Sequence, residues 1–112
     1  FDEMKRFYVD RLGFAVEWEP DSDNVYLTSG GDNLALHRVG ADSACTAGRL
    51  DHLGLLVRQA EDVDRWAAYL DTHGVPLKAR PRTHRDGARS LYLCDPDGNI
   101  IQIIHHPPIS GR

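Results

Sequence analysis

Apolar residues follow a helical spacing and then a strand pattern along this chain, and this order of helix and strands occurs twice. Residues 3–12 and 61–72 carry apolar side chains three or four positions apart, which predicts an amphipathic helix in each segment. Short apolar or alternating runs follow each helix and predict strands. These runs are 14–18, 25–29 and 34–39 after the first helix, and 75–79, 89–93 and 100–104 after the second. The chain is therefore predicted to hold two copies of one helix-and-strand unit.

A weak internal repeat supports this division. Residues 25–36 contain Val-Tyr-Leu, a turn and an apolar strand, and residues 91–103 contain Leu-Tyr-Leu followed in the same way. A unit of this size buries too little apolar surface by itself. We therefore expect the two copies to pack as one α+β domain over 1–112.

The composition of the intervening segment marks the predicted boundaries. Small polar residues fill 40–48 and predict a linker between a first unit at 1–39 and a second unit at 49–106. The second unit begins with a predicted strand at 50–57, whereas the first unit begins almost directly in its helix. We therefore expect the matching first strand to lie upstream of this sequence.

Charge and cysteine content narrow the function classes. The formal net charge of −4 disfavours nucleic-acid binding, which requires a basic face, and no apolar run is long enough to span a membrane. Cys45 and Cys94 are too few for a disulfide framework. They are predicted to be small apolar filler in a protein of a reducing compartment, which indicates the cytoplasm.

Two short motifs point to a family. Leu12-Gly13-Phe14 closes the first predicted helix, and Asp-Pro-Asp-Gly-Asn at 95–99 precedes the last predicted strand. With two βαβββ units, the chain resembles the vicinal-oxygen-chelate superfamily of glyoxalases, bleomycin-resistance proteins and extradiol dioxygenases. The resemblance implies curved mixed sheets around a cavity, a divalent metal ion (Zn, Ni, Mn or Fe) that chelates a small-molecule substrate, and a homodimer.

The resemblance also assigns metal-ligand positions. It matches one ligand to His52 and another to Gln102. The first copy has Ala35 at its ligand position, but His37 lies two residues further on and shares its face, because strand side chains alternate with period two. The expected metal set is thus His52, Gln102 and His37. Since this set holds no carboxylate, two alternatives stay open: a weak metal site, or a cavity that has lost its metal.

Substrate contacts are expected beside this set. Ser90 and Tyr92 match a serine and a tyrosine in the substrate site of fosfomycin-type transferases, although Tyr92 has the alternative of packing in the sheet. The predicted charged loop at 81–87, which contains His84 and is followed by Arg89, is either a solvated hairpin or a cover that binds a carboxylate or phosphate by forked arginine contacts. The candidate substrate-binding residues are Ser90, Tyr92, Arg89 and His84.

Two functions follow from these expectations. The first is a glyoxalase-like, metal-dependent enzyme of lyase, isomerase or thiol-transferase type that acts on a small oxygenated metabolite. Gln102 cannot accept a proton, which weakens a glyoxalase mechanism that needs a carboxylate base. The alternative is a non-catalytic protein of the bleomycin-resistance type that binds a small molecule such as an antibiotic.

Overall fold

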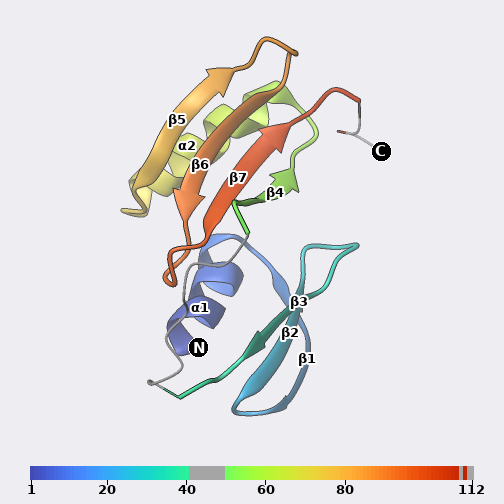
Figure 1. Cartoon of the computed structure of the whole chain (residues 1–112), viewed down its shortest axis with the longest axis vertical. Helices are drawn as coiled ribbons and strands as arrows, with labels where there is room; N and C mark the ends of the chain where they lie inside the picture. The colour runs from blue at the N-terminus through green and yellow to red at the C-terminus, as the bar shows by residue number, and fades with distance from the viewer. Residues whose placement is uncertain (41–49, 109, 111–112) are drawn as a thin grey trace. The chain divides into compact units, whose positions relative to one another are not determined.

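The computed structural model describes residues 1–40, 50–108 and 110, and the chain divides into two compact units (Figure 1). The units are Phe1–Gly48 and Arg49–Arg112, which we describe one at a time. The predicted linker lies, apart from Gly40, outside the described residues. In the described part, no helix is long and apolar enough to cross a membrane.

The first unit holds a short helical segment and a three-stranded antiparallel sheet. Its elements are α1 (Asp2–Arg6), the π-helical turn η1 (Phe7–Arg11), β1 (Ala15–Asp21), β2 (Asn24–Thr28) and β3 (Leu34–His37), in the sheet order β1-β2-β3. The predicted helix is confirmed in place, but its second half widens to a π-helix in which Leu12 N–H donates to the Phe7 carbonyl. Gly13, with φ of +79°, ends it.

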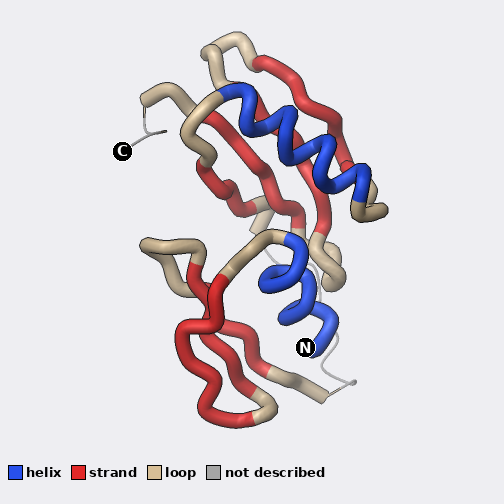
Figure 2. The backbone as a smooth tube through the Cα atoms, turned by 180° about the vertical axis from the view of Figure 1, so that it is seen from behind, coloured by secondary structure: helices blue, strands red, loops and turns tan. Residues whose placement is uncertain are grey.

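The second unit is a four-stranded sheet with a helix on one face (Figure 2). Its elements are β4 (Leu53–Leu56), α2 (Ala60–Thr72), β5 (Leu77–Thr83), β6 (Arg89–Cys94) and β7 (Ile100–His105). The sheet order is β4-β7-β6-β5, in which β4 runs parallel to β7 and the other pairs are antiparallel. A capping box between Gln59 and Asp62 begins α2.

The core of the second unit separates the two faces of its sheet. Apolar side chains of α2 and of alternate strand positions are fully or almost fully buried between helix and sheet: Val63, Ala67, Leu70, Leu91, Leu93, Ile101 and Ile103. Because strand side chains alternate, the intervening residues belong to the opposite face. We call this the helix-free face, and it carries Ser90, Tyr92 and Gln102.

Two sequence expectations are wrong at proline positions. The predicted loop at 81–87 begins too early, because β5 continues through Pro81 to Thr83. Likewise β1 continues through Pro20 to Asp21, three residues beyond the predicted strand at 14–18. Both strands lie at the edge of their sheet, where a missing N–H costs no ladder hydrogen bond.

Both cysteines were predicted to be small apolar filler, a role that requires burial. Cys94 is instead an exposed free thiol at the end of β6, so this prediction is wrong for Cys94, while Cys45 lies outside the described residues.

The segment 95–99 forms a turn between β6 and β7. The Asp95 carboxylate stabilises this turn, because it accepts hydrogen bonds from the backbone N–H groups of Asp97 and Asn99 at 3.0 and 2.8 Å.

Candidate functional site

A hydrogen-bonded pair lies in the middle of the helix-free face. Tyr92 on β6 and Gln102 on β7 are direct cross-strand partners. Gln102 Nε2 donates a hydrogen bond to the Tyr92 hydroxyl at 2.9 Å, and Gln102 is 9% exposed. The polar residue in this otherwise apolar strand is therefore paired, as burial of an amide requires.

His52 lies against this pair from the segment before β4. Its ring meets the Tyr92 ring edge-on, with 5.6 Å between the ring centroids. The Asp51 carboxylate lies 2.6 Å from His52 Nδ1, and a carboxylate there favours the tautomer with its hydrogen on Nδ1. Nε2 is then left with its lone pair.

Gly54 leaves space beside the amide. It pairs with Gln102 across β4 and β7, and a Cβ atom at Gly54 would lie 3.7 Å from Gln102 Oε1. With no side chain at this position, the amide oxygen stays uncovered on that side. The structure thus places His52, Tyr92 and Gln102 together, and their roles as ligands or substrate contacts stay predictions.

A second polar chain occupies the β5–β6 end of the same face. His84 Nε2 lies 2.7 Å from Ser90 Oγ, and Arg82 Nη2 lies 3.1 Å from His84 Nδ1. Ser90 is 2% exposed, while Arg82 is exposed. Since Ser90 and Tyr92 are two positions apart on β6, they share the helix-free face. The structure therefore places His84, Ser90 and Tyr92 together.

Arg89 lies on the opposite face. Its guanidinium forms a two-pronged ion pair with Asp64 of α2, at 2.9 and 2.6 Å, and donates to Thr83 Oγ1 at 3.0 Å. The hydrogen bond from Arg89 to Asp64 and the charge of Arg89 hold the pKa of the Asp64 carboxyl below its usual 3.8. The expectation that Arg89 binds substrate beside Ser90 needs correction, because strand alternation turns its side chain toward α2.

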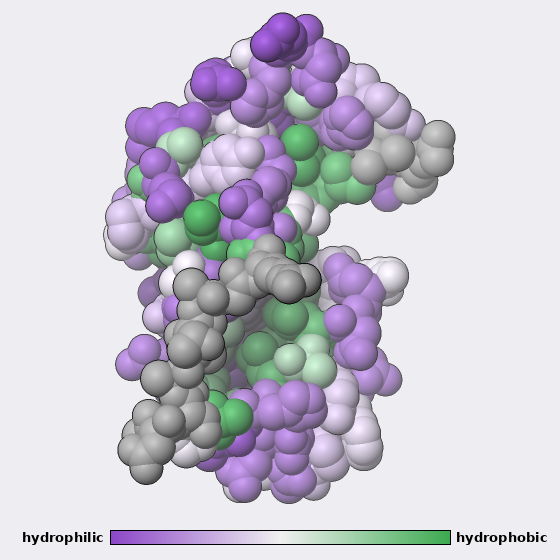
Figure 3. Space-filling model, in the orientation of Figure 1, coloured by the Kyte–Doolittle hydropathy of each residue, from purple (hydrophilic) through white to green (hydrophobic). Residues whose placement is uncertain are grey.

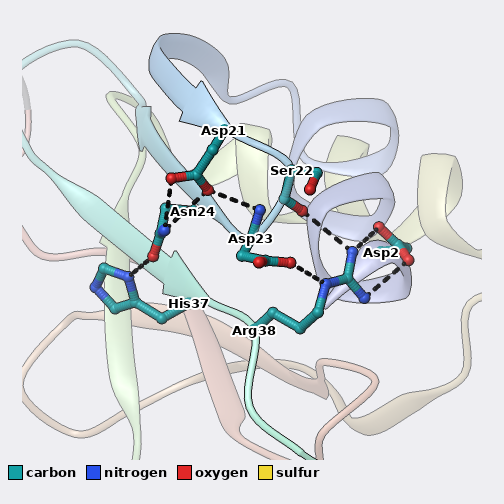
Figure 4. Close-up of polar contacts among 7 residues, drawn as sticks. All are labelled: Asp2, Asp21, Ser22, Asp23, Asn24, His37 and Arg38. Carbon is teal, nitrogen blue, oxygen red and sulfur yellow. Dashed lines mark hydrogen bonds and ion pairs between the residues drawn. The ribbon is translucent and has the colours of Figure 1, made fainter.

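His37 belongs to a polar cluster of the first unit (Figure 4), and aromatic rings lie beside it. Its Nδ1 lies 2.6 Å from Asn24 Oδ1, and the Asn24 amide donates to Asp21. The Tyr26 ring meets the His37 ring edge-on at 5.8 Å, and Trp18 stacks on Tyr26 at 5.2 Å. An amide oxygen accepts, so Nδ1 carries the hydrogen and Nε2 is free. A role as ligand beside His52 stays a prediction.

Apolar surface remains exposed around both sheets (Figure 3). Large apolar side chains that are about half exposed or more include Val16, Trp18, Val39, Leu50 and Leu56. Such surface supplies a physical motive for the homodimer expected from the sequence. The homodimer itself stays a prediction.

Comparison with known proteins decides the family. The family model described as the Glyoxalase/Bleomycin resistance protein/Dioxygenase superfamily matches residues 1–103. The chain belongs to this superfamily. The resemblance and the α+β fold inferred from the sequence are thereby confirmed.

Solved structures of the same fold agree with the glyoxalase-superfamily assignment. Lactoylglutathione lyase from Agrobacterium tumefaciens is 21% identical, with a TM-score of 0.77 over 99% of this chain and 88% of that chain. A glyoxalase/bleomycin resistance protein/dioxygenase from Alicyclobacillus acidocaldarius is 22% identical, with a TM-score of 0.72 over 96% and 83%. TioX from Micromonospora sp. ML1 is 19% identical, with a TM-score of 0.74 over 94% and 89%. At these identities the likeness shows the fold alone.

The glyoxalase superfamily typically binds a divalent metal, so the donors on the helix-free face need testing against one. The described residues contain no group of three or more His, Cys, Asp or Glu side chains placed to hold a metal ion. The face offers His52 Nε2 and Gln102 Oε1, which are two neutral donors. Protein sites hold such ions with three or more ligands, commonly with anionic charge. The donors of the second unit alone do not complete a metal centre.

Two residues of this site were not among the candidates from the sequence. Asp51 orients His52. The place of Asp51 directly before the histidine in the sequence is the signal that could have identified this residue. Arg82 pairs with Ser90 across β5 and β6. It was assigned to a loop, and only the longer β5 places its side chain on the helix-free face.

Proposed function

We propose that this glyoxalase-superfamily chain binds a small oxygen-bearing molecule on the helix-free face of its second unit, without catalysing a reaction. The observation that carries this proposal is the hydrogen bond from Gln102 Nε2 to the Tyr92 hydroxyl. Because the amide fills an acceptor position of this hydroxyl, the Tyr92 hydrogen is available to an acceptor oxygen of a ligand.

The chemistry of the pair favours binding over proton abstraction. A glyoxalase-type reaction removes a proton next to a carbonyl, which needs a base on the face. Gln102 is a neutral amide, and the Asp51 carboxylate has an 89% exposed side chain. His52 Nε2 is the base that remains, and it would act without a metal centre to acidify the substrate, because the donors of the second unit do not complete one. The non-catalytic alternative predicted from the sequence therefore suits these residues best.

The proposal is tested by screening small carboxylates, phosphonates and oxygenated heterocycles for a rise in melting temperature of the full chain. For any compound that binds, Tyr92→Phe is expected to raise the Kd about fivefold, since one hydrogen bond contributes about 1 kcal/mol. Tyr26→Phe, in the first unit, is the matched control and should leave the Kd unchanged. Equal effects of both changes, or neither change having an effect, would refute binding at Tyr92.

A metal-dependent lyase, isomerase or thiol transferase is the second candidate. The contact between Asp51 and His52 favours it, because metal-binding histidines usually donate their other N–H to a carboxylate. Its test is the metal content of untagged protein beside His52→Ala. Stoichiometric metal that is lost in the variant supports this candidate. No metal after incubation with Zn, Ni, Mn and Fe rules it out.

A further inference from the structure

We infer that Arg82 and His84 are positioning residues that make Ser90 a hydrogen-bond donor to a small oxyanion. This inference rests on the proposed function, because the oxyanion would be the part of the ligand that meets β6. It begins from the polar chain on the helix-free face. His84 lies between its two partners, with its Nδ1 3.1 Å from Arg82 Nη2 and its Nε2 2.7 Å from Ser90 Oγ.

The direction of these hydrogen bonds follows from the chemistry of arginine. A guanidinium group only donates, so His84 Nδ1 must accept and cannot carry a hydrogen. The single hydrogen of the neutral imidazole is then on Nε2, which donates to Ser90 Oγ. His84 therefore cannot take the Ser90 proton, and the pair is not the nucleophile and base of a hydrolase.

The Ser90 hydroxyl keeps its own hydrogen for a further partner. Within the described part of the chain, the Ser90 hydroxyl has His84 as its hydrogen-bond partner, and Ser90 is only 2% exposed. A buried donor without an acceptor is unfavourable, and an acceptor oxygen from a ligand would satisfy it. A chain of bonds that begins at a cation also strengthens the last donor.

Tyr92, two positions along β6, also has a hydroxyl hydrogen that is available to a ligand. Its oxygen accepts from Gln102, so it too presents a hydrogen. The two Cα atoms are separated by roughly 6.8 Å, as expected for positions i and i+2 of a strand. Two donor hydroxyls favour a ligand group that presents several acceptor oxygens, such as a carboxylate, phosphate or phosphonate.

The hydrogen-bond direction is tested without any ligand. Long-range ¹H–¹⁵N NMR of the full chain, in mildly alkaline solution, distinguishes the two tautomers of His84. We expect the hydrogen on Nε2 in the unmodified protein and in Arg82→Lys, and a mixture of tautomers in Arg82→Met. Arg85→Met, a change at the exposed neighbour of His84, is the matched control and should keep the Nε2 form. A hydrogen on Nδ1 in the unmodified protein would overturn the inference.

The ligand class is tested with inorganic phosphate and pyruvate as probes and methylguanidinium, which only donates, as the control. The two oxyanions are expected to shift the Ser90 amide resonance. Arg82→Met and Ser90→Ala should each raise the Kd for these oxyanions about fivefold. The double variant should bind the oxyanions as tightly as either single variant, because Arg82 acts through Ser90. Binding that depends on Tyr92 but not on Arg82 or Ser90 overturns this inference and leaves the proposed function standing. The Nε2 tautomer with no binding of any compound overturns the proposed function, and with it the oxyanion assignment.

Discussion

The pair formed by Tyr92 and Gln102 leads to a prediction about stability in which the two partners differ. Tyr92→Phe removes the acceptor and leaves the amide of Gln102, a residue only 9% exposed, without its 2.9 Å hydrogen bond. A buried donor left unpaired costs about 1–3 kcal/mol of unfolding free energy. Gln102→Leu leaves the Tyr92 hydroxyl without its donor, but Tyr92 is only half-buried, so water can reach this hydroxyl and replace the amide. We therefore expect it to cost only about 0.5–1.5 kcal/mol, the net value of one hydrogen bond.

The double variant provides the decisive comparison. When both partners are replaced by apolar groups, no unpaired group remains, so the double variant should be more stable than Tyr92→Phe alone. Urea denaturation of the full chain followed by circular dichroism measures all four proteins. Tyr26→Phe is the control, and we expect a change within about 0.5 kcal/mol. Equal costs for the two single changes that simply add in the double variant would refute the reasoning.

The other predictions concern the second unit and are read from the same denaturation assay. Leu70→Ala, at a side chain with no exposure, should cost about 2–5 kcal/mol, and Leu56→Ala, at a residue 50% exposed, about 1 kcal/mol or less; equal costs would contradict the burial assignment. Gly98→Ala should cost about 1–2 kcal/mol, because the residue has a φ of +86°. The pKa of Asp64 lies below 3.8 in the folded chain, so its stabilisation is present above the unfolded pKa and is lost as the pH falls through the folded pKa. Asp64→Asn should thus reduce stability by about 0.5 kcal/mol at pH 6, an exposed pair being weak, and the difference should vanish in strong acid; a constant difference across the pH range would exclude the ion pair with Arg89 as its cause.

Hydrophobic periodicity predicted the fold well where a segment has one buried face. The helix α2 was expected at 61–72 and is observed at Ala60–Thr72, because Val63, Ala67 and Leu70 repeat at helical spacing. The same logic failed at Pro81, since proline usually ends a strand. Whether a proline is tolerated depends on its strand being at the edge of the sheet, and sheet order is not a local property of the sequence.

The family resemblance supplied most residues of the candidate site, and their roles stay predictions. The resemblance named Gln102, Ser90 and Tyr92, and strand alternation explains why Ser90 and Tyr92, two positions apart, share a face. Arg89 shows the limit of residue type as a guide. An arginine beside the charged loop at 81–87 suggested an anion contact, but strand alternation turns the guanidinium toward α2, where Asp64 binds it. The choice between two faces required the three-dimensional partner.

The position of β4 has a consequence for the order of folding. Among the described strands its one partner is β7, to which it runs parallel, and α2, β5 and β6 all lie between these two strands in the chain. The β5-β6-β7 meander forms by short hairpins, whereas β4 must close a long loop before its pairing is rewarded. We expect β4 to join last in folding and to open first. Its backbone amides should therefore exchange hydrogen for deuterium faster than those of β6, which has a neighbour on each side.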